Sequence, residues 1–152
     1  MAHDERPRAR VTMLIKAPAQ AVFGAFIDPA VLAKFWLSSA SAPLRVGEPV
    51  DWRFMVDGAT ARPVATRLVV DEHIAWRWSD GTVQIDLAPF DGGTAITVIN
   101  EGFPGDQQAQ VEAALNATEG FCIVLCDLKT LLESGRSAGL TRAKAQLIEA
   151  RR

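Results

Sequence analysis

The sequence lacks tyrosine altogether and contains only two histidines and two cysteines. It also lacks any apolar run close to the ~20 residues that a membrane-spanning helix needs. Residues 1–8 are polar and lack the apolar centre of a secretion signal. We therefore expect a flexible N-terminus over residues 1–8, no membrane insertion, and a location in the reducing cytoplasm.

An excess of positive charge is missing as well. The formal net charge is −2, so no global basic field would attract nucleic acid. Basic side chains gather only in the tail, residues 136–152, where Leu147 and Ile148 give the spacing of a short amphipathic helix. We expect a solvated basic tail and no nucleic-acid partner.

The shortage of histidine and cysteine restricts catalysis and metal binding. His3 lies near the chain end and His73 at a predicted hairpin, so both are expected in solvent. The sequence shows no Ser-His-Asp arrangement and no nucleophile elbow. Cys122 and Cys126 share a helical face, where a disulfide has poor geometry and zinc would need two more ligands. We expect free cysteines, no metal and no cofactor.

What the chain does contain is the composition and periodicity of one α+β domain. Hydrophobic residues make up 49% and charged residues 22%, which is usual for a globular domain. A β-rich segment at 11–15 precedes a helix that starts after Pro18, and Asp28-Pro29 starts a second short helix. The serine-rich run 38–43 has the composition of a loop.

The period of the apolar residues changes to two over residues 50–101. Apolar side chains alternate with polar ones in successive runs. The runs are separated by short turn sequences such as Asp57-Gly58 and Asp80-Gly81. This pattern predicts a meander of antiparallel strands.

After these strands the apolar period becomes helical. It predicts one long helix from about Asp106 to Ser134, with Gly135 as its C-terminal stop. At 1.5 Å per residue the helix would be about 40 Å long, enough to cross a whole sheet. Gly120 within it costs ~1 kcal/mol relative to alanine, which indicates close packing or a kink at that position.

An ordered set of short motifs runs through residues 11–135. It comprises Ala17-Pro18, Asp28-Pro29, Phe35-Trp36, Leu44–Gly47, Trp76–Trp78, Leu87–Thr94, Gly102-Phe103 and Glu119–Phe121. In this set the chain resembles the START-like or SRPBCC (Bet v 1-like) superfamily. Within it, the chain is most similar to the subgroup named for the activator of the heat-shock protein 90 ATPase homologue.

The resemblance implies an α+β fold of the helix-grip type. A curved antiparallel sheet of six or seven strands would wrap around the long C-terminal helix, with two short helices between strands 1 and 2. The domain would span residues 9–135. Two positions depart from the family pattern: Asn100 stands where many relatives show histidine, and Gly120-Phe121 where many show Gly-Trp. Both would face the cavity of this fold, so we expect its polarity and shape to be particular to this chain.

Aromatic residues dominate the surface expected to enclose the cavity. Strand alternation and the covering helices predict these lining residues: Phe35, Trp36, Trp52, Phe54, Trp76, Trp78, Asn100, Phe103, Phe121 and Leu125. Such aromatic side chains either fill a core or line a pocket for a flat or apolar ligand. For any single residue we favour core packing, and for the group we favour a cavity.

Asn100 and Glu101 are the polar residues of interest at the end of the last predicted strand. Alternation turns Asn100 inward, where a buried amide needs a partner. It either makes a structural hydrogen bond, to a backbone group or to Thr118, or it orients a ligand. Glu101 is the only candidate that we identify for a general acid, a role that would need burial to raise its pKa.

Three functions remain open. The leading hypothesis is the binding of a small apolar or aromatic molecule between the sheet and the long helix. The first alternative is an enzyme that resembles polyketide cyclases or hydratases and uses the same cavity. The second is a protein–protein module that regulates a chaperone, as the family name implies. A homodimer or other protein partner would need a large exposed apolar patch, for which the tail helix is the candidate.

Overall fold

The computed structural model describes residues 6–151 of the chain. Within this part the strands are β1 (Ala9–Ile15), β2 (Leu37–Ala40), β3 (Trp52–Phe54), β4 (Thr60–Ala61), β5 (Val64–Val69), β6 (His73–Trp78), β7 (Gly81–Phe90) and β8 (Gly93–Glu101). The helices are α1 (Ala19–Ile27), α2 (Pro29–Phe35), α3 (Gln107–Ser134) and α4 (Leu140–Ala150). Of the N-terminal residues 1–8 that we expect to be flexible, residues 1–5 lie outside the described part of the chain.

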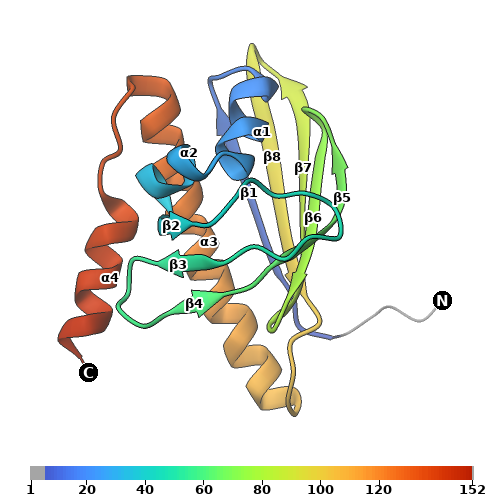
Figure 1. Ribbon diagram of the computed structural model, residues 1–152, viewed down its shortest axis with the longest axis vertical. Coiled ribbons are helices and arrows are strands. Elements are labelled where there is room, and N and C mark those ends of the chain that lie inside the picture. The colour runs from blue at the N-terminus through green and yellow to red at the C-terminus, as the bar shows by residue number, and fades with distance from the viewer. Residues whose placement is uncertain (1–5, 152) are drawn as a thin grey trace.

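The main sheet contains five antiparallel strands in the order β1-β8-β7-β6-β5 (Figure 1). β1 pairs with β8 along its whole length, with Val11 opposite Val98. Asp91 and Gly92, which join β7 to β8, both have positive φ angles (47° and 75°), as a tight two-residue hairpin requires. Buried residues alternate along β8, so one face of the sheet points toward α3. The helix-grip architecture is thereby confirmed.

The other three strands form a small second sheet in the order β2-β3-β4. The structure therefore differs from the expectation of one sheet of six or seven strands. Pro63 stands between β4 and β5, and its nitrogen carries no hydrogen, so the ladder cannot continue through it. The small sheet stays attached because the amides of Gly47 and Val50 donate to the carbonyls of Ala65 and Pro63, at 2.9 and 3.1 Å.

The prediction of a loop over residues 38–43 is wrong for its first half, which belongs to β2. The hydroxyl of Ser38 is shared between two carbonyls of β3, at 3.1 Å each, and Leu37 is fully buried. A strand this short buries one large side chain only. It therefore leaves no period-two pattern in the sequence.

The two short helices begin where the sequence predicts. The carboxylate of Asp28 accepts a hydrogen bond from the amide of Ala30 at 2.9 Å, and Pro29 occupies the first turn of α2. The rings of Phe26 and Phe35 meet edge to face at 5.6 Å between α1 and α2. These helices thus close one end of the molecule, the upper end in Figure 1.

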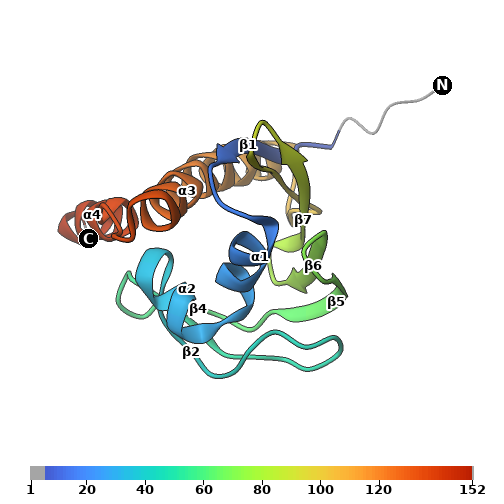
Figure 2. The ribbon, with the colours of Figure 1, turned by 90° about the horizontal axis from the view of Figure 1, so that it is seen from above.

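Both C-terminal helices form as predicted. Asp106 caps the start of α3 by accepting from the amide of Ala109 at 2.9 Å, and Gly135 ends it in the left-handed conformation with φ 81°. α4 then turns back and lies beside α3. Figure 2 shows α3 and α4 on one side of the molecule, with β5, β6 and the small sheet opposite them. In residues 6–151 we find no helix with the length and apolar character to cross a bilayer.

Candidate functional site

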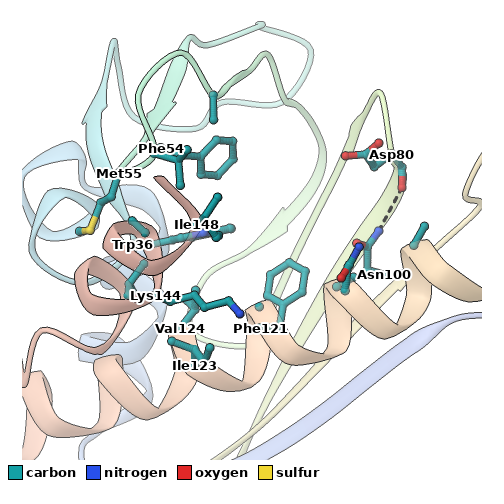
Figure 3. Close-up of a pocket in the computed structure, with 18 of the residues that line it drawn as sticks. Trp36, Phe54, Met55, Asp80, Asn100, Phe121, Ile123, Val124, Lys144 and Ile148 are labelled. Carbon is teal, nitrogen blue, oxygen red and sulfur yellow. Dashed lines mark hydrogen bonds between the residues drawn. The ribbon is translucent and has the colours of Figure 1, made fainter. Parts of the chain in front are cut away.

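A partly open cavity of about 750 Å³ lies between the two sheets, α3 and α4 (Figure 3). Most of its lining is aromatic or aliphatic, and Trp36, Phe54 and Phe121 face into it. The polar and charged members of the lining are Asp80, Asn100, Asn116, Thr141 and Lys144. The site is therefore an apolar space with a few polar groups at its border.

One face of α3 forms the floor of this cavity. Ala117, Gly120, Phe121 and Val124 share it at helical spacing. A Cβ atom added at Gly120 would meet nothing within 4 Å, so the prediction of close packing there is wrong. The helix is continuous through this position. Gly120 instead leaves open space on the cavity side of α3.

Trp36 lies at the centre of an aromatic cluster beside the cavity. Its ring centroid is 5.1 Å from that of Trp52, 5.6 Å from Phe121 and 6.1 Å from Trp76. Trp78 joins the cluster at 5.6 Å from Trp76. All four tryptophans of the chain are thus in mutual contact. Trp36 and Trp76 are tilted at 42°, and the other pairs quoted are edge to face. Edge-to-face pairs contribute about 0.5–1.5 kcal/mol each beyond their burial.

The structure divides the ten predicted lining residues into two groups. Those that border the cavity are Trp36, Phe54, Trp78, Asn100, Phe103 and Phe121. Those in the core behind the lining, all 0% exposed, are Phe35, Trp52, Trp76 and Leu125. Strand alternation identifies which face is inward, but the depth of a side chain behind that face depends on tertiary packing.

The indole N–H groups of Trp52, Trp76 and Trp78 are buried and have no hydrogen-bond acceptor in the described part of the chain. Trp52 and Trp76 meet at 5.3 Å with their planes at 73°. The two rings thus pack edge to face in the core. Since its nitrogen is buried, Trp78 presents carbon atoms to the cavity.

Asn100 is buried and turned inward, as strand alternation predicts. Its side-chain nitrogen donates to the backbone carbonyls of Thr82 (3.0 Å) and Asp80 (3.3 Å; Figure 3). Thr118 takes no part, because its hydroxyl donates to the carbonyl of Ala114. Of the two roles considered for Asn100, the amide nitrogen thus has the structural one, a hydrogen bond to backbone groups. The amide oxygen receives no hydrogen bond from residues 6–151 and remains an acceptor at the cavity border.

The contribution of α4 to the cavity was missed by the sequence reasoning. Thr141, Lys144, Ala145 and Ile148 all belong to the lining. The signal was present in their spacing of three and four residues, which places them on one helical face. The tail is therefore not simply a solvated basic surface, because its one lysine, Lys144, borders an apolar space.

A buried carboxylate holds the start of α4. Asp127, on α3, is 1% exposed and accepts hydrogen bonds from the hydroxyl of Ser137 (2.5 Å) and the amide of Thr141 (3.2 Å). The Thr141 hydroxyl donates in turn to the carbonyl of Phe35 at 2.7 Å. These bonds fix the first turn of α4 against both α3 and α2.

Two charged side chains hold the rest of α4. Lys144 Nζ lies 2.6 Å from Glu119 Oε1 on α3. Nearer the C-terminus, a carboxylate oxygen of Glu149 accepts from the amide of Asp57 at 2.8 Å, in the loop between β3 and β4. α4 therefore spans from α3 to the small sheet and closes one side of the cavity.

The candidates for acid–base chemistry lie elsewhere. Glu101 is absent from the cavity lining, and alternation with Asn100 places it on the opposite face of β8. His73, expected in solvent, has a side chain only 14% exposed, and its Nδ1 lies 2.7 Å from Asp86 Oδ1. His3 is outside the described residues.

Both cysteines are free thiols. Burial raises the pKa of Cys126, and the neighbouring Cys122 raises it further. Over residues 6–151 no group of three or more histidine, cysteine or acidic side chains is arranged to hold a metal ion. The raised pKa means that the Cys126 thiol is not activated by its surroundings, so nucleophilic chemistry at this residue has no support here.

Solved structures share this fold. The protein SSP2350 from Staphylococcus saprophyticus is 28% identical with a TM-score of 0.76, over 86% of this chain and 94% of that one. The Aha1 dimer from Colwellia psychrerythraea is 18% identical with a TM-score of 0.75, over 86% and 98%. DynU16, from the dynemicin biosynthetic locus, is 23% identical with a TM-score of 0.75, over 86% of this chain and 49% of that one. The last two likenesses show the fold alone.

No curated protein matches the sequence significantly. The family described as Activator of Hsp90 ATPase homolog 1-like protein matches residues 16–133, from the end of β1 to the last turn of α3. This match confirms the resemblance seen in the motifs. The chain belongs to the Activator of Hsp90 ATPase homolog 1-like family.

Proposed function

We propose that this protein binds a small apolar or aromatic molecule in the cavity between the sheets, α3 and α4. The observation that supports this most is the cavity itself, about 750 Å³ with a mainly aromatic and aliphatic lining. Small-molecule sites span ~300–1,000 Å³ and have this composition. Burial of apolar ligand surface would drive binding at ~25 cal/mol per Å².

The lining favours binding over catalysis. Among the described residues that border the cavity there is no histidine, cysteine, serine or glutamate. Asp80 is the one carboxylate of the lining, and no lining residue pairs with it as an acid–base partner. The alternative of a cyclase-like or hydratase-like enzyme rests on likeness of fold alone, such as that to DynU16, a protein from a biosynthetic locus.

A protein partner is the second candidate function. α4 exposes Leu140 (37%) and Leu147 (47%) on its outer side, and the Colwellia relative is described as a dimer. Size-exclusion chromatography with light scattering tests the homodimer directly, and a monomer at all micromolar concentrations would exclude it. We also propose a cytoplasmic location, which the exposed free thiol of Cys122 supports.

Native mass spectrometry of the protein purified from its own host tests the binding function. We expect a species heavier than the polypeptide that loses its extra mass on denaturation. The released molecule should be apolar or aromatic and small enough for the cavity. If the protein carries no added mass and also binds no member of a panel of aromatic compounds, the proposed function is wrong.

A further inference from the structure

Lys144 carries the only positive charge among the described residues that line the cavity. It lies on α4, which begins at Leu140, whereas the family match ends at residue 133. The charge is thus supplied by an element outside the segment that the chain shares with its family.

The ammonium group of Lys144 has capacity for a ligand. Within the described chain its ion-pair partner is Glu119, at 2.6 Å, and an ammonium group has three N–H donors. The Lys144 side chain is 33% exposed and that of Glu119 is 58% exposed. Figure 3 shows the Lys144 side chain extending along the cavity toward Phe121. Glu119 is outside the lining, so a ligand could reach the ammonium from the cavity side.

Two polar groups elsewhere in the lining have the opposite character. Asp80 carries a negative charge, and the free oxygen of Asn100 is an acceptor. Figure 3 shows these two residues together, apart from Lys144, with Phe121 between them. An anionic group on a ligand would be repelled near Asp80 and attracted near Lys144. The two ends of the apolar cavity therefore differ in electrostatic potential, negative near Asp80 and positive near Lys144.

We propose that Lys144 makes the cavity selective for apolar or aromatic ligands that carry a carboxylate. The carboxylate binds the ammonium of Lys144, the apolar body lies over Phe121 and Trp36, and a hydroxyl or N–H at the far end donates to Asn100. This inference rests on the proposed function and specifies its ligand class.

Calorimetric titration with two matched probes, naphthaleneacetic acid and naphthaleneacetamide, tests the inference. The probes have nearly the same shape, and only the acid is charged at pH 7. We expect the wild-type protein to bind the acid about three to ten times more tightly than the amide, as for a partly exposed ion pair. Equal affinities would overturn the inference and leave the proposed function intact. Binding of neither probe would overturn the inference, and the proposed function would fall with it only if the protein also retains no ligand and binds no other member of the aromatic panel.

Two variants distinguish recognition of the carboxylate from docking of α4. Both remove the Lys144–Glu119 ion pair, but only Lys144→Met removes the ammonium group. Lys144→Met keeps the apolar stem and should abolish the preference for the acid. Glu119→Gln removes a competing carboxylate and should strengthen acid binding. In both variants the affinity for the uncharged amide should change much less than the affinity for the acid. If the two variants shift acid and amide together and in the same direction, Lys144 only docks α4 and the inference is wrong.

Discussion

The hydroxyl of Thr141 donates a 2.7 Å hydrogen bond to the backbone carbonyl of Phe35, across 106 positions in the sequence. The bond joins the first turn of α4 to the last residue of α2, directly before Trp36 at the cavity. Because Thr141 also donates its amide to buried Asp127, one residue connects α2, α3 and α4. The geometry of the cavity therefore depends on how firmly α4 is held.

Asp127→Ala should release the start of α4. The variant removes the acceptor of two hydrogen bonds, from Ser137 and Thr141, and should lower the free energy of unfolding by about 1–3 kcal/mol. Hydrogen exchange should rise most in the amides of α4. Ser137→Ala is the matched control, since it removes one of the two bonds and should have a smaller effect. Unchanged exchange in α4 would show that other contacts hold it.

Gly120→Ala should stabilise the protein. The added methyl group meets no atom within 4 Å, and alanine is favoured over glycine inside a helix by about 1 kcal/mol. A gain close to that value in chemical denaturation is the expected result. A loss of stability would mean that the space above Gly120 is occupied in the folded protein.

Glu133→Gln should change stability in a pH-dependent way. Hydrogen bonds from Lys129 Nζ and from the amide of Lys16 (2.9 Å) lower the pKa of Glu133. Since the folded-state pKa is the lower one, this contribution is complete above the unfolded pKa, ~4.3, and is lost as pH falls through the folded pKa.

Urea denaturation of both proteins between pH 7 and 3 measures this effect. Because the carboxylate is exposed to solvent, the wild-type advantage at pH 7 should be small. It should shrink further in acid until the two unfolding midpoints converge. A difference that stays constant over the whole range would exclude the carboxylate charge as its cause.

Local signals in the sequence were sufficient for most of the fold. Pro18, Asp28-Pro29, Asp106 and Gly135 mark helix ends through their own backbone chemistry, and the structure has the ends where these residues predict them. β2 was missed because it buries only Leu37, and the division into two sheets depends on Pro63. A single residue can break a strand ladder without altering the apolar pattern around it.

The residues that line the cavity could be predicted less completely from the sequence. Trp52 and Trp78 have the same sequence signal, an aromatic residue at an alternating strand position, yet Trp52 is in the core and Trp78 borders the cavity. Which of them meets open space depends on what covers the sheet. The lining from α4 could have been proposed from the spacing of Thr141, Lys144 and Ile148, but nothing local shows which way that helix turns.

The binding of naphthaleneacetamide to the wild type, Gly120→Ala and Gly120→Leu tests the central claim most directly. The larger side chain at position 120 would project into the cavity from α3, while alanine would leave most of the space free. The account predicts that the wild type and Gly120→Ala bind the probe with similar affinity in calorimetry, and that Gly120→Leu folds normally and binds it at least about ten-fold more weakly. Equal binding by Gly120→Leu would contradict a ligand site in this cavity, as would a wild type that binds neither this probe nor any other member of the aromatic panel.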